Sequence, residues 1–215
     1  MNQKIVTPTP YGSVGIVWIH SDQGPKVVRV LLSRPGLPAE RQVVGLYPTI
    51  RVASCPEIDA VGAGMKRLLS GEPADFSLHL ADLDRCGEFQ DRVLRAELAI
   101  PRGMVSTYRL IAARLGKPNN ARAVGNALAN NPFPLIVPCH RTIRSDGQLG
   151  GYQGGPEMKR ALLEKEGFVF DGTGIRGQVN CDRTPLKRAE DFARSGRAGL
   201  NSSVQQMALL HPLRW

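Results

Sequence analysis

The stretch that decides the fold of this chain runs from Ser106 to Arg141 and reads STYRLIAARLGKPNNARAVGNALANNPFPLIVPCHR. Its first two thirds carry apolar or small residues at helical spacing, namely Tyr108, Ile111, Ala112 and Leu115, then Ala121, Val124, Gly125 and Leu128. Ser106 is a plausible N-cap for the first helix, and Gly116 ends it. Asn119 or Asn120 opens the second helix. The pattern predicts a helix-turn-helix, a motif found in DNA-binding proteins and in many proteins that never bind DNA.

Two residues of the second helix favour the DNA-binding interpretation. Arg122 lies in its first turn, where recognition helices approach a groove. Gly125 stands in mid-helix at a cost of about 1 kcal/mol relative to Ala. That cost is easier to explain where another backbone must come close.

The distribution of charge supports the same interpretation. The chain of 215 residues has a formal net charge of +9, which favours acidic partners. There is no acidic residue between Glu97 and Asp146. The same window holds seven cations: Arg102, Arg109, Arg114, Lys117, Arg122, Arg141 and Arg144. A solvated face normally mixes both signs, so the window is suited to phosphates, although a basic surface without a partner is the alternative.

The end of the stretch carries the chemistry. A free thiol has a pKa near 8.5, so Cys139 needs a base or a positive field to act as a nucleophile at neutral pH. His140 is adjacent and can supply the base, while Arg141 and Arg144 can supply the field. A downstream carboxylate could hold the imidazole in the required tautomer. The alternative, a buried cysteine beside an incidental histidine, is countered by the surrounding frame.

That frame consists of Asn131, Pro138 and a glycine-rich segment from Gly147 to Gly155 that contains Tyr152. Such a segment is typical of an active-site loop.

Working outward, the chain divides into three parts. Residues 1–81 are expected to form a small α/β domain, residues 82–176 a mostly helical domain, and residues 177–215 an extension of unknown role. In the first part the sequence predicts a hairpin of strands 11–20 and 26–33, a strand at 42–46, a helix at 56–70 and a short strand at 76–80. Further helices are expected at 88–99, 184–193 and 203–210.

The number and spacing of the cysteines indicate whether the chain binds a metal and in which cellular compartment it is expected. Cys55, Cys86, Cys139 and Cys181 form no CxxC pair and have no histidine at zinc-ligand spacing, so we expect neither a metal nor another cofactor. Widely spaced single thiols fit a reducing cytosol. Residues 1–10 lack the apolar segment of a signal peptide, and no run is long enough for a membrane span. We therefore expect a cytoplasmic protein without a membrane partner.

At this point the chain resembles the O6-alkylguanine-DNA alkyltransferases, also called methylated-DNA–protein cysteine methyltransferases. The matching segments include Phe89-Gln90-x-x-Val93, Ile100-Pro101-x-Gly103-x-Val105-Ser106-Thr107-Tyr108, Ala121-Arg122-Ala123-Val124-Gly125, Asn130-Asn131-Pro132, Ile136-Val137-Pro138-Cys139-His140-Arg141, Gly151-Tyr152 and Leu162-Leu163-x-x-Glu166-Gly167. Order and spacing agree from about residue 86 to 170, and more loosely from the N-terminal hairpin onward. The resemblance implies a winged-helix type of catalytic domain behind the small α/β domain.

The resemblance also implies roles for five residues. Cys139 matches the alkyl acceptor, His140 the base that deprotonates it through a water, and Glu166 the carboxylate bonded to that imidazole. Asn131 matches the hinge residue that braces the turn. Tyr108 matches the residue that helps rotate the nucleotide and donates towards the departing purine. From the residues alone, Tyr108 could be a core residue and Glu166 a surface residue paired with a lysine.

The remaining expected contacts follow in the same way. Arg122 matches the finger that enters through the minor groove and fills the gap left by the flipped guanosine. The other expected DNA contacts are Thr107, Ala121, Gly125, Arg141 and Ser145. The expected alkylguanine pocket consists of Leu128, Thr142, Tyr152 and Gln153, with main-chain groups of Cys139 and Thr142 accepting from the guanine amino group. The chain departs from the family at Gln153, commonly Ser or Arg, and at Leu94, often Trp.

These observations predict a monomeric DNA repair protein that moves an alkyl group from O6 of guanine, or also O4 of thymine, in duplex DNA irreversibly to Cys139. An enzyme acting on a stacked base must extrude it, and a stable thioether allows one turnover. One alternative is a lesion binder or regulator without transfer, although related alkyltransferase-like proteins lack the acceptor cysteine. Another is a cysteine hydrolase acting on a small ester or amide.

Overall fold

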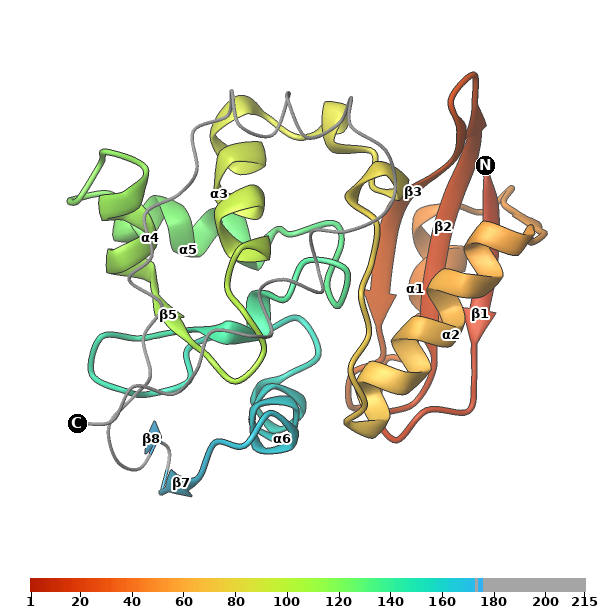
Figure 1. The fold of residues 1–215 in the computed structure, drawn as a ribbon. Helices are drawn as coiled ribbons and strands as arrows, with labels where there is room; N and C mark the ends of the chain where they lie inside the picture. The colour runs from red at the N-terminus through yellow and green to blue at the C-terminus, as the bar shows by residue number, and fades with distance from the viewer. Residues whose placement is uncertain (173, 176–215) are drawn as a thin grey trace, which may run out of the picture. The chain divides into compact units, whose positions relative to one another are not determined.

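The computed structural model describes residues 1–172, 174 and 175 of the chain, and it has an α/β fold (Figure 1). The N-terminal part contains a four-stranded sheet in the order β3-β2-β1-β4. Its strands are β1 (Asn2–Val6), β2 (Val14–Ser21), β3 (Gly24–Leu32) and β4 (Arg51–Val52). The β2–β3 pair is the expected hairpin, and β1 pairs antiparallel with β2 and parallel with β4.

Two helices cover the two faces of this sheet, α1 (Ala39–Leu46) and α2 (Pro56–Ser70) (Figure 1). Side chains of neighbouring residues in a strand point to opposite faces. On β1, Ile5 packs against the cluster around Val43 of α1, whereas Val6 lies against Gly62 of α2. Burial on both faces explains why residues 14–18 of β2 are apolar without alternation.

Two expected strands are wrong. Residues 42–46 belong to α1, in which Ala39 and Val43 are buried at the i, i+4 spacing of a helix. The two adjacent valines gave a local β signal that burial of this helical face overrides. Residues 76–80 contain a 3-10 helix, η1 (Leu78–Leu80), instead of a strand. Strand β1 was missed because NQKIV is short and largely polar.

The second part is mostly helical. Its elements are η2 (Leu83–Arg85), α3 (Glu88–Leu98), β5 (Ser106–Thr107), α4 (Tyr108–Arg114), α5 (Ala121–Ala129), η3 (Cys139–Arg141), β6 (Thr142–Ile143), α6 (Pro156–Lys165), β7 (Phe170–Asp171) and β8 (Gly174–Ile175). Helices α4 and α5 are the expected helix-turn-helix pair. The N-cap of α4 is Thr107, whose Oγ1 accepts from the Leu110 N–H at 3.1 Å, and not the expected Ser106.

The two parts are tied together beside the loop that carries Asn131. The Val30 N–H of β3 donates to the Pro132 carbonyl at 2.7 Å. The Asp82 N–H donates to the Val27 carbonyl on the same strand at 2.9 Å. Strand β3 therefore holds the segment that leads into Cys139.

Some expectations lie outside the described residues, namely the extension 177–215 and the helices expected within it at 184–193 and 203–210. The division at residues 81 and 176 stays a prediction. Among the described helices, none combines the length and the apolar character that crossing a membrane requires.

Candidate active site

Cys139 opens the single turn η3, which lies between the loop 130–138 and strand β6. Strand β6 pairs in parallel with β5, Ser106 opposite Thr142 and Thr107 opposite Ile143. Because β5 leads directly into Tyr108 at the start of α4, this short ladder fixes the position of the helix-turn-helix relative to the thiol.

Asn131 braces the turn. It is 1% exposed, and its Oδ1 accepts from the Phe133 N–H at 2.9 Å. Its Nδ2 donates to the Cys139 Sγ at 3.3 Å and lies 3.5 Å from the Val137 carbonyl. Within the same loop, Leu135 adopts a φ of 74°, a left-handed conformation that is unfavourable for a leucine. The surrounding contacts must compensate for it.

His140 and Glu166 form a buried pair. The Nε2 of His140 lies 3.0 Å from the Glu166 Oε1, with side chains 0% and 2% exposed. The Arg141 Nη2 donates to the same carboxylate at 2.9 Å, and the Gly103 N–H donates at 3.3 Å. Burial alone would raise the pKa of Glu166, but hydrogen bonds from His140 and Arg141 outweigh it and lower that pKa to about 2. Glu166 is therefore an acceptor, and the proton of neutral His140 must lie on Nε2.

The other ring nitrogen of His140 is then a free base. Its Nδ1 is buried and has no hydrogen-bond partner among the described residues. Burial lowers the pKa of His140, so the ring is neutral at physiological pH. Tyr152 stands beside it, with ring centroids 6.3 Å apart in an edge-to-face arrangement.

The resting state of the thiol differs from the sequence expectation. Burial, followed by the charge of Glu97, raises the pKa of Cys139 to about 12. The two arginines expected to supply a positive field are engaged elsewhere, Arg141 with Glu166 and Arg144 with Asp146. Cys139 is therefore a protonated thiol at rest, and its proton must be removed when it reacts.

A pocket of about 490 Å³ opens onto the sulfur. It is lined by Arg34, Tyr108, Gly125, Leu128, Ala129, Cys139, Gly151, Tyr152 and Gln153. Burial raises the pKa of Tyr108 to about 12, so its hydroxyl stays a donor. Gly150, at a φ of +69°, leaves room for that hydroxyl, because an added Cβ would lie 2.7 Å from it.

Of the four expected pocket residues, Leu128 and Tyr152 line the pocket as expected, whereas Thr142 and Gln153 differ from the expectation. Thr142 is fully buried and does not line the pocket, and its carbonyl accepts from the Lys159 Nζ at 2.6 Å. Gln153 does line the pocket, but its side-chain amide donates to the carbonyls of Ala129 at 3.2 Å and Asn131 at 2.5 Å. The side chain of Gln153 therefore supports the end of α5 and the Asn131 loop.

The expected DNA contacts fall into two groups. Arg122 and Ser145 are exposed, and Ala121 and Gly125 are half-buried on α5. Thr107 is buried and caps α4. The guanidinium of Arg141 points inward, because it holds Glu166 and donates to the Ile100 carbonyl at 2.7 Å. That placement argues against a direct phosphate contact by Arg141.

Three residues at the site were missed from the sequence. Arg34 reaches the pocket from the loop after β3, and no local pattern could connect it with Cys139. Glu97 on α3 and Lys159 on α6 are both 0% exposed. Their signal was available, because Glu97 follows Val93 by four positions and Lys159 precedes Leu162 by three, which puts each charge on a buried helical face.

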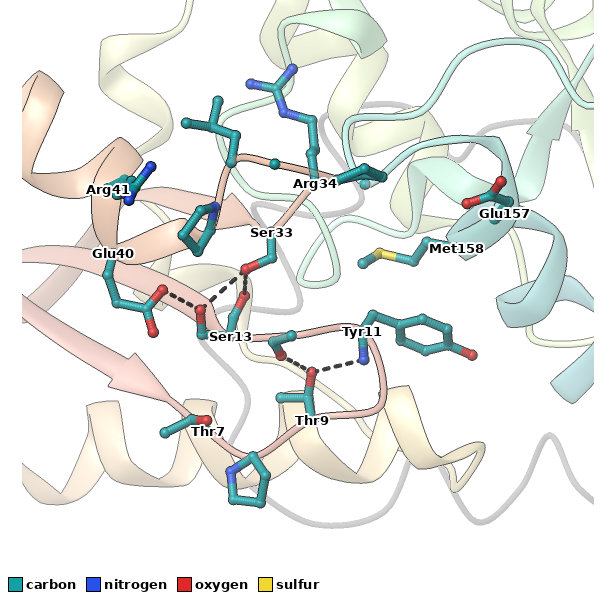
Figure 2. A pocket seen from close by; sticks show the side chains of 17 residues that line it. Thr7, Thr9, Tyr11, Ser13, Ser33, Arg34, Glu40, Arg41, Glu157 and Met158 are labelled. Atoms are coloured by element: carbon teal, nitrogen blue, oxygen red, sulfur yellow. Dashed lines mark hydrogen bonds between the residues drawn. The ribbon is translucent and has the colours of Figure 1, made fainter.

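A second, larger cavity of about 730 Å³ lies away from the sulfur (Figure 2). Ser13 hydrogen-bonds there with Ser33 at 3.1 Å and with Glu40, so these polar groups satisfy one another. Figure 2 shows the Arg34 guanidinium pointing away from the two serines. Because Cys139 lines the smaller pocket and not this cavity, the chemistry belongs to the smaller pocket.

Known proteins share this arrangement. The DNA-binding domain of 6-O-methylguanine DNA methyltransferase matches residues 88–168. The methylated-DNA–protein-cysteine methyltransferase of Methanothermobacter thermautotrophicus is 48% identical over 108 residues, which cover 50% of this chain and 60% of that protein. The Mycobacterium leprae protein of the same name is 45% identical over 124 residues, covering 56% and 73%.

Solved structures extend the likeness beyond that domain. The structure of Mycobacterium tuberculosis OGT in complex with DNA aligns with a TM-score of 0.62 at 32% identity, over 77% of this chain and 92% of that one. The O6-methylguanine methyltransferase of the same organism aligns at 0.61 and 31%. The chain belongs to the methylated-DNA–protein-cysteine methyltransferase family.

Proposed function

We propose that this protein repairs DNA by transferring a methyl or other alkyl group from O6 of guanine in duplex DNA irreversibly to the sulfur of Cys139. The observation that carries this proposal is the free Nδ1 of His140, whose ring is held as a base by the ionised Glu166 and follows directly in the chain on Cys139, which lines a pocket. O4-alkylthymine is a second candidate lesion of the same chemistry.

The reaction is a direct displacement at the alkyl carbon. The Cys139 sulfur forms the S–C bond as the C–O6 bond breaks, and the guanine keeps the electron pair of that bond. The thiol proton passes to the Nδ1 of His140, through a water where the two are not in direct contact. Tyr108 donates a hydrogen bond towards the purine and stabilises the negative charge that develops there. The product thioether is stable, so each polypeptide reacts once.

The target base must first leave the duplex. Nucleotide flipping costs a few kcal/mol of unstacking and unpairing. Arg122 stands exposed in the first turn of α5, where it can enter the duplex and offset part of that cost. The half-buried Gly125 lies on the same helix and lines the pocket, which keeps that path open.

Intact-mass analysis tests the proposal. Incubation with duplex containing O6-methylguanine should add one methyl mass per chain, located by peptide mapping on Cys139. The Cys139→Ser variant should gain no mass while still binding the duplex. Folded wild-type protein without a mass gain would end the proposal, and tight binding of the lesion in that case would favour a non-enzymatic binder. Turnover of a small ester without DNA would favour a hydrolase.

We further propose that the protein acts as a monomer in the cytoplasm. Cys55, Cys86 and Cys139 are free thiols, which suits a reducing compartment. Sedimentation velocity with and without a single-site duplex tests the monomer, because a dimer would have twice the protein mass in either state.

A further inference from the structure

Two buried charged residues, Glu97 and Lys159, are bonded to the segment that follows Cys139 and do not line its pocket. Glu97 of α3 is fully buried, and its Oε2 accepts from the Thr142 Oγ1 at 2.5 Å. Its Oε1 has no hydrogen-bond partner among the described residues. An unpaired carboxylate oxygen in a protein interior is costly, and such groups need a structural or functional explanation.

Lys159 of α6 is the second member. Its side chain is fully buried, and its Nζ donates to the Thr142 carbonyl at 2.6 Å and lies 3.3 Å from the Gly151 carbonyl. Glu97 and Lys159 thus both bind Thr142, one through the hydroxyl and the other through the main chain. Thr142 is three residues after Cys139 and directly follows the turn η3.

Both charges act on the thiol. Among the charged groups that influence Cys139, Glu97 opposes ionisation of the sulfur and Lys159 favours it. In a dry interior such interactions are stronger than at the surface, because little water screens them. The arginines next to Cys139 in the sequence do not take this role, since their guanidinium groups are paired with Glu166 and Asp146.

We propose that Glu97 and Lys159 are positioning residues of the transfer reaction, which set through opposite buried charges how readily Cys139 loses its proton. Ionised Glu97 keeps the sulfur protonated, and Lys159 limits that effect. This inference rests on the proposed role of Cys139 as acceptor and adds two residues to it. Neither residue touches the reacting atoms.

The sign of the effect follows from the ionisation states. Burial raises the pKa of Glu97 to about 7, and burial lowers the pKa of Lys159 to about 8. Near pH 8 Glu97 is therefore mostly a carboxylate and Lys159 is about half protonated, whereas above that pH only the charge of Glu97 remains. The other charged or titratable groups that act on Glu97 or are affected by it, besides Lys159 and Cys139, are Arg114 and Tyr108 of α4 and Arg141 of η3.

The test is the pH profile of Cys139 alkylation by iodoacetamide in the full-length protein without DNA, read by peptide mass spectrometry. Glu97→Gln keeps the volume and removes the charge, and should lower the apparent pKa of Cys139 by about one unit. That raises the thiolate fraction about tenfold and the alkylation rate near pH 8 about threefold, because a less basic thiolate is also less nucleophilic. Lys159→Met should lower the alkylation rate at and below about pH 8, where the Lys159 amine still carries a charge, and should have little effect at higher pH.

Two surface variants serve as controls. Glu164→Gln and Lys165→Met change exposed residues of α6, and both should leave the profile unchanged. An unaltered apparent pKa in folded Glu97→Gln would overturn the proposal, because a residue that only packs or bonds to Thr142 has no reason to shift it. If that variant does not fold, an unaltered alkylation rate below pH 8 in Lys159→Met overturns it equally. No DNA is used, so failure here is separate from failure of wild-type methyl transfer.

Discussion

Removing the charge of Glu166 should destabilise the protein by an amount that depends on pH. The pKa of this carboxyl falls from an ordinary value of 4.5 to about 2 in the folded chain. The shift of about 2.5 units corresponds to about 3 kcal/mol of stabilisation. Because the folded-state pKa lies below the unfolded one, this stabilisation is fully present above about pH 4.5 and is lost as pH falls towards 2. The side chain is 2% exposed, so solvent screening takes little from it.

Urea unfolding of wild type and Glu166→Gln measures the difference directly. At pH 7 the variant should be less stable by about 3 kcal/mol, and at pH 2.5 by less than about 1 kcal/mol, since most of the wild-type stabilisation is then gone. Glu164→Gln is the matched control, because that exposed residue pairs with Arg160 at the surface and should cost at most about 0.5 kcal/mol at either pH. An equal loss for Glu166→Gln at both pH values would refute an ionised, tightly bound carboxylate.

Four further predictions concern transfer and DNA. Arg122→Ala should slow repair of O6-methylguanine in duplex more than reaction with free O6-alkylguanine base, measured by single-turnover mass analysis; equal losses would contradict the role in flipping. Tyr108→Phe should lower the single-turnover rate by at least about tenfold with lesion binding largely kept, as expected when one donor to the leaving group is lost; weakened binding at an unchanged rate would contradict it. Gly150→Ala should reduce both stability, by about 1 kcal/mol or more, and transfer, because the new Cβ is strained at a φ of +69° and would lie 2.7 Å from the Tyr108 hydroxyl; thermal unfolding and single-turnover assays check both. Duplex affinity should fall steeply with added salt, since phosphate contacts release counterions; a flat dependence in fluorescence anisotropy would argue against the basic window as the DNA surface.

The sequence predicted the elements whose local and tertiary signals agree. The hairpin at β2 and β3, helix α2 with its stop at Gly71, and the pair α4 and α5 are confirmed. The secondary structure was predicted wrongly where a segment was too short to show a clear helical or strand periodicity. Residues 42–46 carry two adjacent valines, and only the burial of Val43 against the sheet shows that they are helical.

The site residues that are close in the sequence could be predicted, and those brought together only by folding could not. Cys139, His140 and Asn131 lie close in the sequence, and the family resemblance of this segment implied their shared role. The charges around the sulfur could not be predicted in this way, because they depend on which partner each side chain meets. Arg141 follows Cys139 and His140 in the sequence, but its guanidinium is paired with Glu166. Lys159 lies twenty positions after Cys139, and its charge lowers the pKa of the thiol.

A thiol with a raised pKa is consistent with a reaction that each polypeptide performs once. A resting thiolate would react with any small electrophile, and the acceptor would be lost without repair. In this chain, burial and Glu97 keep Cys139 protonated, while the Nδ1 of His140 has no hydrogen-bond partner among the described residues and Tyr108 keeps its proton. The unpaired base at His140 and the donor at Tyr108 therefore suit the charges that develop during transfer better than those of the resting protein. Interactions that strengthen only in the transition state are the ones that accelerate a reaction.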